Sequence, residues 1–429
     1  MSVSLERMNQ NLAARRPLQD KIARKIVFAM LEHLRDGCLV LEEGGRSYSF
    51  GEKTSQHAVS ARVSIASQAA YRQILFNGGV GVAEAYMQGS WKTPDLLAVI
   101  QLFARNQQAL SAMKNPWTRF GGALLRFFHL MNTNSITGSR RNISAHYDLG
   151  NEFFSLMLDP TMMYSSAIYP FPGASLHEAS INKLEHICRR LDLQRDDHLL
   201  EIGTGWGGLA MYAAQNFGCQ VTTTTISKEQ YDYALASVKK AGLQNQITVL
   251  FEDYRNLEGR FDKLVSIEMI EAVGHRFYPQ FFRGCSKLLK PGGLMLLQSI
   301  TIADQRYRQY LKSTDFIQRY IFPGGELPSI QVLADQFARH SDMQVVGLED
   351  ITPHYADTLA DWRKNFWANI SQIRDLGFDS VFEKMWEYYL CYCEGGFRER
   401  VISTVQLLAA KPERRALPSI GTNRPANSD

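Results

Sequence analysis

Residues 198–207, with the sequence HLLEIGTGWG, constrain the fold of this chain more than any other stretch. The first residues predict a buried strand, and Gly203, Gly205 and Gly207 follow it directly. The next residues, GLAMYAAQNFG, are typical of a helix. Glycine permits a tight turn and lets the backbone approach a ligand, and the helix N-terminus offers unpaired N–H groups to a negative group. The stretch therefore predicts a nucleotide-cofactor site.

Two further features of this stretch narrow the kind of cofactor. Glu201 lies two residues before the first glycine, and a second predicted strand, CQVTTTTI, begins at Cys219. The pattern E-x-G-x-G-x-G resembles motif I of class I methyltransferases, which bind S-adenosylmethionine, rather than the G-x-G-x-x-G of dinucleotide sites. An ordinary tight strand-to-helix turn is the alternative interpretation of the glycines alone.

Length and composition limit the classes that fit the rest of the chain. The 429 residues suffice for two or three domains, and 45% of them are hydrophobic. A net charge of +4 does not indicate nucleic-acid binding, so no nucleic acid is expected. The six cysteines form no C-x-x-C pair, and the N-terminus has no signal-peptide pattern, which favours a cytoplasmic protein without a metal. No apolar run reaches the ~18 residues of a membrane span, so we expect peripheral contact at the inner face of the membrane.

Residues 1–131 are predicted to form a small α+β domain that associates with lipid. A helical pattern in KIARKIVFAMLEHL precedes the short alternating runs CLVLEE, RSYSF and ARVSIAS. No acidic residue occurs between Asp95 and Asp148, whereas six basic residues do: Arg105, Lys114, Arg119, Arg126, Arg140 and Arg141. Within this stretch, residues 117–131 (WTRFGGALLRFFHLM) have the pattern of a basic amphipathic segment that suits an anionic bilayer. The alternative is a core helix that joins two domains. The two interpretations are compatible if only part of the apolar face of this helix is buried.

From residue 132 the pattern changes to a regular alternation of strands and helices. Runs of Val, Leu and Ile without strict alternation are expected of parallel strands covered on both faces. We predict a methyltransferase domain at 132–412, built on a doubly wound, mostly parallel, seven-stranded Rossmann-like sheet with a helical insert, and a disordered tail at 413–429. Its ligand site is expected at the C-terminal ends of the strands.

Residues 142–412 resemble the cyclopropane-fatty-acyl-phospholipid synthase family, which includes the mycolic acid cyclopropane synthases. Several motifs occur in the family's order: HYDLGNEFF, MMYSSAIYP, LLEIGTGWGGLA, TTISKEQ, EDYRNL, MIEAVG and YIFPGGELPS. The N-terminal region also resembles the extra domain of longer bacterial members, through AEAYMQGSW. Together these motifs are far more specific than any one of them.

The resemblance implies a set of contacts to S-adenosylmethionine. These contacts are Tyr164, Ser165, Gly203, Gly205, Gly207, Thr225, Gln230, Asp253 and Tyr254, with Asp253 and Tyr254 near the adenine. The Glu201 carboxylate and aromatic faces would favour the sulfonium cation, and Gln230 can hydrogen-bond a ribose. Helix capping is the alternative role of Thr225 and Gln230.

The resemblance also implies a reaction. Family members methylate the cis double bond of a fatty acyl chain, and the resulting carbocation loses a proton as the cyclopropane closes. They hold a bicarbonate as the base, through a cysteine, a glutamate, a histidine, an isoleucine and a tyrosine. The corresponding catalytic positions here, with a further family cysteine near the end of the chain, are Ser166, Glu271, Gln298, Ile300, Tyr355 and Cys393.

Two of these positions, and the residue that follows the glutamate, depart from the family pattern. Ser166 replaces the cysteine, Gln298 replaces the histidine, and Ala272 follows the glutamate where histidine is usual. Serine and glutamine still donate hydrogen bonds to an oxyanion, but neither titrates near neutral pH as histidine does.

The departures leave two enzymatic hypotheses and one of another class. The first is cyclopropane formation on the unsaturated acyl chains of membrane phospholipids. The second is C-methylation that ends in a methyl-branched or methylated unsaturated chain. The third is a degenerate lipid-binding protein, against which the intact motif I and Glu271 count. The oligomeric state is left open, with a homodimer as one option.

We predict that binding to membranes is salt-sensitive, because each of the six basic residues contributes about 1 kcal/mol at best near an anionic surface. Liposome flotation measures this, with removal of the charges of Arg119 and Arg126 as the test. Equal binding to anionic and neutral vesicles would show that the segment is a packed linker instead.

Overall fold

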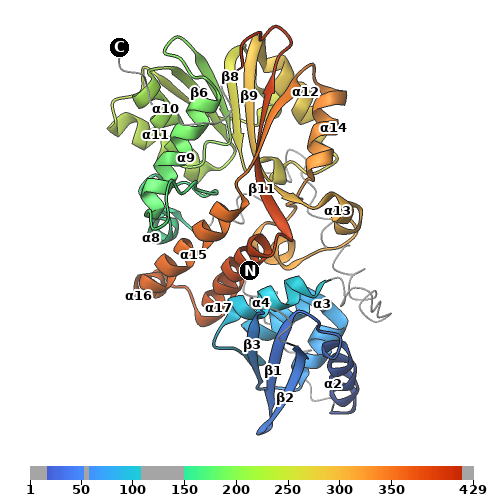
Figure 1. Cartoon of the computed structure of the whole chain (residues 1–429). Helices are drawn as coiled ribbons and strands as arrows, with labels where there is room; N and C mark the ends of the chain where they lie inside the picture. Colours follow the sequence, from blue (N-terminus) through green and yellow to red (C-terminus); the bar gives the residue numbers. More distant parts are fainter. Residues whose placement is uncertain (1–16, 53–57, 108–148, 418–429) are drawn as a thin grey trace. The chain divides into compact units, whose positions relative to one another are not determined.

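The computed structural model describes residues 17–52, 58–107 and 149–417, and the chain divides into two compact units (Figure 1). The first unit comprises residues 1–131, 312–321 and 374–401, and the second comprises residues 132–311, 322–373 and 402–429. Two later segments of the chain thus belong with the N-terminal region. The change of unit at residue 132 and the basic segment 117–131 lie outside the described residues.

The first unit has the α+β character expected of it. Its four-stranded sheet has the order β2-β1-β3-β4. The strands are β1 (Gly37–Glu43), β2 (Arg46–Glu52), β3 (Ser60–Ile65) and β4 (Trp91–Lys92). Its helices are α2 (Pro17–Leu31), α3 (Ala69–Met87), α4 (Leu96–Arg105), the π-helical turn η3 (Ile317–Ile321) and α17 (Ser380–Arg398).

Charged hydrogen bonds hold the two later segments in the first unit. The buried carboxylate of Glu84 in α3 accepts a hydrogen bond of 2.7 Å from the Tyr320 hydroxyl. The guanidinium of Arg105 in α4 pairs with Glu399 at 2.7 Å. Because removal of one partner would leave the other charge or donor unsatisfied, these contacts fix segments that are distant in sequence.

The second unit contains the predicted seven-stranded sheet, with the order β10-β11-β9-β8-β5-β6-β7. Its strands are β5 (His198–Ile202), β6 (Gln220–Thr225), β7 (Ile247–Phe251), β8 (Phe261–Ile267), β9 (Leu289–Ile302), β10 (Gln344–Asp350) and β11 (Ile402–Ala410). The strands β5 to β9 pair in parallel, and β11 pairs antiparallel with both β9 and β10. The predicted fold class is confirmed.

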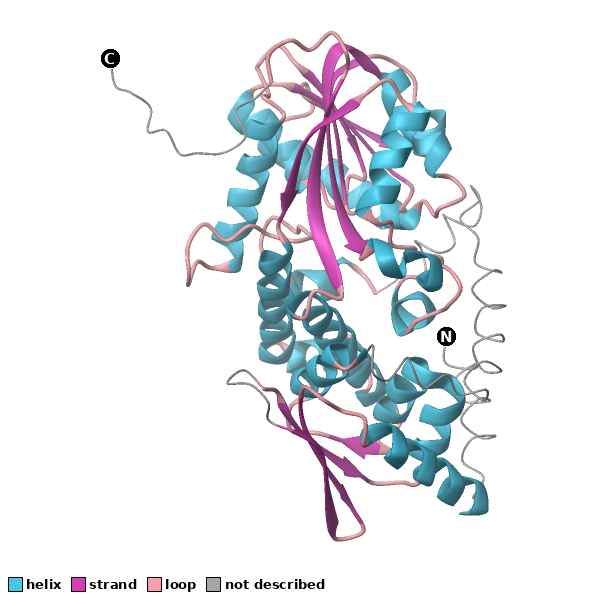
Figure 2. Ribbon diagram, turned by 45° about the vertical axis from the view of Figure 1, so that its right-hand side comes forward, coloured by secondary structure: helices cyan, strands magenta, loops and turns pink. Residues whose placement is uncertain are grey.

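Helices cover both faces of this sheet (Figure 2). The helices are α8 (Asn151–Met157), α9 (Leu176–Arg190), α10 (Gly208–Phe217), α11 (Lys228–Lys240), α12 (Tyr278–Leu288), α13 (Asp304–Tyr310), α14 (Ile330–His340) and α15 (Thr352–Ala368), and α16 (Ile370–Asp375) begins in this unit. Leu199 of β5 packs into a core with α9, α10 and α11, whereas its neighbour Leu200 packs into a second core with α12 and α14. Successive strand residues face opposite layers, which is why the strands lack polar alternation.

Helix α9 brings two basic side chains into the interior of this unit. A capping box at Ser175 and Glu178 begins the helix, since each side chain bonds the other's backbone N–H. The helical period then places Lys183 and Arg190 among the buried residues of α9. Both cations therefore depend on partners inside the protein.

Strand β8 ends three residues earlier than predicted. The sequence FDKLVSIEMI predicts a strand over 261–270, but β8 ends at Ile267 and a 3-10 turn, η2 (Ile270–Ala272), follows. Glu268 has a φ of 48°, and a non-glycine residue in this left-handed region cannot continue a strand. The sequence KPGG at residues 290–293 predicts a turn, but these residues are part of β9, where the pairing with β8 shifts register.

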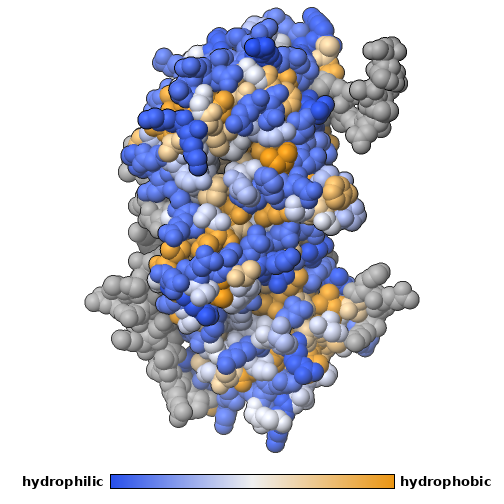
Figure 3. All heavy atoms as spheres, turned by 90° about the vertical axis from the view of Figure 1, so that its left-hand side faces the viewer, coloured by the Kyte–Doolittle hydropathy of each residue, from blue (hydrophilic) through white to orange (hydrophobic). Residues whose placement is uncertain are grey.

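The surface view in Figure 3 shows hydrophobic residues among predominantly hydrophilic ones on one face of the molecule. Within the described ranges, no helix combines the length and the hydrophobicity needed to cross a bilayer.

Candidate active site

The glycine turn after β5 has the backbone geometry that the sequence predicted. Gly203, Gly205 and Gly207 have φ angles of 105°, 52° and 90°, which favour glycine over any other residue. A Cβ built on Gly205 would meet no atom within 4 Å, so open space lies beside the turn. The first turn of α10 begins directly after Gly207. The open backbone surface and the helix N-terminus fit a cofactor such as S-adenosylmethionine.

Glu201, in β5, is linked to this turn by hydrogen bonds. Its Oε2 atom is 2.6 Å from the Thr223 hydroxyl, which is 2.7 Å from the hydroxyl of Thr204 in the turn. Burial raises the pKa of Glu201 to about 8, and the Thr223 hydrogen bond and the charge of Lys183 oppose that shift. The structure thus connects Glu201 to the turn through Thr223, which gives it a part in fixing the backbone that would face the cofactor.

Other predicted cofactor residues lie at the end of β6, in the first turn of α11 and just after β7. The hydroxyl of Thr225 donates to Oε1 of Gln230 at 3.0 Å, and Ser227 rather than Thr225 caps α11. Asp253 pairs with Arg255 at 2.7 Å, and Tyr254 begins the turn η1 (Tyr254–Asn256). Since β5, β6 and β7 are neighbouring parallel strands, these residues share one edge of the sheet with the glycine turn.

Tyr164 and Ser165 lie in the loop that leads to α9. The Tyr164 ring lies 5.2 Å from the Phe154 ring and 5.1 Å from the Trp362 ring, measured between centroids. Ser165 accepts a hydrogen bond of 2.8 Å from the Lys183 ammonium group, which is fully buried. Burial lowers the pKa of Lys183 to about 8, while Glu268, Asp159 and Glu201 oppose the shift. Lys183 was not among the residues predicted from the sequence, although it is one of the buried residues of α9.

Glu268 is the acceptor around which three predicted catalytic residues converge. Its Oε1 atom accepts from the Ser166 N–H at 2.9 Å and from Gln298 Nε2 at 2.7 Å. Its Oε2 atom accepts from the Tyr355 hydroxyl at 2.7 Å. Burial raises the pKa of Glu268, and its three hydrogen bonds and Lys183 oppose that shift. The half-buried side chain keeps part of its surface accessible.

Glu268 was also missed from the sequence, because residues 261–270 were interpreted as one strand. Within a strand, its side chain would alternate with its neighbours across the sheet. The left-handed backbone instead ends the strand at this residue. An acidic residue at the C-terminal end of a parallel strand, where ligand sites form, was the available signal.

Glu271 and Ile300 form a second cluster beside Glu268. The Glu271 Oε1 atom accepts from the Ile300 N–H at 2.6 Å and from the Ser299 hydroxyl at 2.9 Å. Its Oε2 atom is buried and has no hydrogen-bond partner among the described residues. Burial, and next the negative charge of Glu268, raise the pKa of Glu271 to about 8. The two carboxyl groups therefore disfavour being ionised together.

Cys393 and Ala272 are not members of these two clusters. Cys393 lies on α17 in the first unit, whereas the other predicted catalytic residues lie in the second. Burial raises the pKa of the Cys393 thiol, so the reactive thiolate is disfavoured. Ala272 lies in η2 and carries no group that can bind a ligand by hydrogen bonds.

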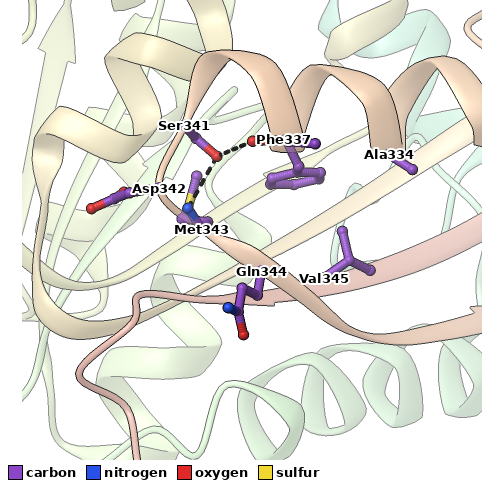
Figure 4. Close-up of a pocket in the computed structure, with 8 residues that line it drawn as sticks. Ala334, Phe337, Ser341, Asp342, Met343, Gln344 and Val345 are labelled. Atoms are coloured by element: carbon purple, nitrogen blue, oxygen red, sulfur yellow. Dashed lines mark hydrogen bonds between the residues drawn. The ribbon is translucent and has the colours of Figure 1, made fainter.

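A pocket in the second unit lies between the end of α14 and the start of β10 (Figure 4). Phe337, Met343 and Val345 supply its apolar lining, and the Ser341 hydroxyl bonds the Phe337 carbonyl at 2.7 Å. None of the predicted site residues lines this pocket. It is therefore separate from the residues that carry the chemistry.

The fold and the glycine turn define the class of protein. The arrangement of the sheet, the glycine turn and the helices is that of class I S-adenosylmethionine-dependent methyltransferases. The crystal structure of the mycolic acid cyclopropane synthase CmaA1 complexed with SAH and CTAB is similar with a TM-score of 0.59 and 33% sequence identity. The similarity covers 63% of this chain and 98% of that one.

A family model described as mycolic acid cyclopropane synthetase matches residues 134–407. The chain belongs to this family. It is 37% identical over 342 residues to the tuberculostearic acid methyltransferase UfaA1 of Mycobacterium tuberculosis, covering 78% of this chain and 79% of that protein. It is 35% identical over 345 residues to the cyclopropane-fatty-acyl-phospholipid synthase of Escherichia coli, covering 80% and 85%. The family and these relatives make it an S-adenosylmethionine-dependent enzyme that methylates or cyclopropanates lipid acyl chains.

We predict that Gly205→Val abolishes binding of S-adenosylmethionine while the fold persists, because the added side chain enters the open space beside the turn. Isothermal titration calorimetry measures the binding. Gly242→Val is the matched control, since Gly242 also has a positive φ, of 73°, and open surroundings but lies after α11. Unchanged affinity in Gly205→Val would remove the cofactor assignment.

Proposed function

We propose that this enzyme transfers a methyl group to the double bond of an unsaturated fatty acyl chain and that Glu268 accepts the proton released afterwards. The observation that carries the proposal is the position of the Glu268 carboxylate. It lies within hydrogen-bond distance of Ser166, Gln298 and Tyr355, three of the positions that the family resemblance assigned to the base site.

The cofactor-binding residues proposed are those at the edge formed by β5, β6 and β7, with Tyr164 and Ser165. When bound, S-adenosylmethionine supplies an electrophilic methyl group. Glycines 203, 205 and 207 leave the backbone free to approach it, and Gln230 offers an amide to a hydroxyl group. The aromatic rings of Tyr164 and Trp362 suit a cationic ligand.

Glu268 serves the reaction in two ways. Methylation of one alkene carbon leaves a positive charge on the acyl chain, and a fixed carboxylate stabilises that charge more than it stabilises the neutral alkene. The same carboxylate then accepts a proton from the cation, and the electrons of the broken C–H bond form a new C–C or C=C bond. Three hydrogen bonds and Lys183 favour the ionised form of Glu268, so we assign the base to Glu268 and the neutral carboxyl to Glu271.

A bicarbonate base does not fit these residues. Gln298 Nε2 and the Tyr355 hydroxyl, which the resemblance implied as its holders, already donate to Glu268, as does the Ser166 backbone. The Ile300 N–H donates to Glu271. A carboxylate of the chain itself thus stands where an exogenous base would require free donors, and no step of the proposed reaction uses bicarbonate.

The proton that is lost determines the product. Loss from the transferred methyl group with ring closure gives a cyclopropane, whereas loss that forms a double bond gives a methylated unsaturated chain. We favour the second product, because Ser166, Gln298 and Ala272 depart from the pattern of cyclopropane synthases and because one of the relatives is named for methyl transfer. Cyclopropane formation is the second candidate, favoured by the relative from Escherichia coli.

The substrate is proposed to be an acyl chain of a membrane phospholipid. The name of the Escherichia coli relative specifies a fatty-acyl phospholipid, and this chain covers 85% of that protein. Contact with an anionic membrane surface follows as part of the same proposal. The N-terminal region, residues 1–131, is proposed to provide that contact through its basic segment.

Glu268→Gln is expected to lower turnover by about 10²–10⁴-fold and to leave cofactor affinity nearly unchanged, because the amide keeps the shape but neither accepts a proton nor carries a charge. Mass spectrometry of fatty acids from cells expressing each form measures the product and distinguishes a ring from a methylated unsaturated chain. Full methylation by the variant would refute the role of Glu268, and a cyclopropane product from the natural enzyme would favour the second candidate.

The pH dependence of kcat/KM should have an acid limb above the ordinary glutamate pKa of about 4.3, because the base acts as a carboxylate and burial raises its pKa. Turnover is thus retained above the limb and lost as the pH falls through it. Lys183→Met removes a buried positive charge that favours the carboxylate of Glu268, so it should raise the pKa of Glu268 and move the limb to higher pH. Glu258→Gln, at an exposed glutamate, is the control that should leave it in place.

A further inference from the structure

We propose that Arg190 and Gln406 form a positioning relay that orients the side-chain amide of Gln298, so that its NH2 group faces Glu268. The inference deepens the proposed function, since it rests on the role of Glu268 as the base. Neither Arg190 nor Gln406 touches the reacting groups. Both act through Gln298, the residue at the histidine position of the family pattern.

The relay follows a row of paired residues across the sheet. Glu349 of β10 pairs with Gln406 of β11, and Gln406 pairs with Gln298 of β9. The carbonyl of Gln298 accepts the backbone N–H of Glu268, directly after β8, at 2.9 Å. Cross-strand partners lie close enough for their side chains to interact. Four neighbouring strands thus place the row of polar residues in a sheet interior that is otherwise rich in leucine.

Hydrogen bonds join the row from one end to the other. Nη1 of Arg190 donates to Glu349 Oε2 at 2.9 Å and to Gln406 Oε1 at 3.1 Å. Nε2 of Gln406 donates to Gln298 Oε1 at 2.9 Å. Nε2 of Gln298 donates to Glu268 Oε1 at 2.7 Å. Gln298 and Gln406 are both 0% exposed, so water cannot replace the hydrogen bond between their amides.

The direction of the relay follows from the chemistry of its cationic end. A guanidinium group only donates hydrogen bonds, so the amide of Gln406 must turn its oxygen to Arg190. Its NH2 group then faces Gln298, which must accept that hydrogen bond with its own side-chain oxygen. The NH2 group of Gln298 is left facing Glu268. Rotation of either amide by half a turn would bring two donors or two acceptors together in a buried site, which is costly.

This orientation matters for a carboxylate base. The NH2 group of Gln298 stabilises the ionised form of Glu268, whereas the amide oxygen would repel it. A protonated Glu268 could donate its O–H to the amide oxygen of Gln298, so Glu268 alone does not fix which end of that amide faces it. Arg190 removes that ambiguity from the far side of the sheet. Its Nε and Nη2 atoms have no hydrogen-bond partner among the described residues, which indicates that Nη1 supplies its polar contacts.

Other charged groups surround both ends of the relay and must stay constant in a test. Lys183 of α9, Tyr355 of α15 and Glu271 of η2 influence Glu268. Glu349 pairs with Arg190 and also with His186, whose Nε2 atom lies 2.8 Å from Glu349 Oε2. His354 of α15 also acts on Glu349. None of these groups is altered in the variants that test the relay.

Gln406→Glu tests the relay with little change of shape. One oxygen of the new carboxylate pairs with Arg190, and the other faces Gln298, which must turn its NH2 group away from Glu268. Protonation of Glu268 is measured by difference infrared spectroscopy, with the Glu268→Gln spectrum identifying its carboxyl band. We expect the midpoint of this titration to rise by about one pH unit or more, a tenfold change in the protonation constant.

A double-variant cycle separates the relay from a through-space effect of the new charge. In a Gln298→Met background no amide can turn, so the relay predicts that Gln406→Glu no longer shifts the midpoint. Equal shifts in both backgrounds, or no shift in either, would overturn the proposal. Thr404→Val is the matched control, because its hydroxyl lies two residues away on β11, is buried and has no hydrogen-bond partner. It should leave the midpoint unchanged.

A second variant keeps the test decisive if Gln406→Glu does not fold. Arg190→Met removes the group that sets the direction of the relay, and the same cycle with Gln298→Met applies to it. Thermal unfolding of each variant shows which forms are folded. The infrared titration needs no turnover, so it tests the relay even if Glu268 is not the base, and the proposed function fails separately if Glu268→Gln retains full activity.

Discussion

The stability of a partly buried carboxylate is the constraint on which the active site depends. An ionised Glu268 in a region of low dielectric requires hydrogen-bond donors and a nearby positive charge, or it will protonate. The second unit meets this requirement from four directions: the loop before α9 through Ser166, strand β9 through Gln298, helix α15 through Tyr355, and the charge of Lys183. These elements are distant in sequence, so the carboxylate can be accommodated only once the whole unit has folded.

The doubly wound sheet explains why the donors converge at this point. Parallel strands end at one edge, and β8 and β9 are neighbours, so the residue after β8 lies beside the end of β9. The left-handed conformation of Glu268 ends β8 and turns the chain into η2, which then brings Glu271 to the Ile300 N–H. Two carboxyl groups with different numbers of donors result. Such a difference separates the pKa values of neighbouring acids, which is the usual physical basis for a division between a base and a neutral partner.

The sequence predicted those features that depend on local pattern. Residues 198–218 were enough to predict strand β5, the tight glycine turn and helix α10, because glycine spacing and hydrophobic runs are local patterns in the sequence. Glu268 could not be found in the same way, since its role depends on where β8 ends and not on the residues around it. Lys183, Arg190 and Gln406 were missed for a related reason. A polar residue on an apolar face shows only that it needs a partner, and the partner comes from another strand or helix.

Glutamines 298 and 406 occupy sheet positions where leucine would be the more stable choice. The residues next to them on β9 and β11, Leu297 and Leu407, are buried to the same degree and pair with one another. A buried amide pair contributes little net stability even when every hydrogen bond is made, whereas apolar side chains gain from leaving water. The polar row is therefore best explained by its effect on the active site, because it ensures that the NH2 group of Gln298 faces Glu268. The Leu297 and Leu407 pair faces the helices α12 and α14, and the glutamine pair faces the opposite layer, from which α9 supplies Arg190. One strand pairing thus serves the hydrophobic core on one side of the sheet and the electrostatics of the active site on the other.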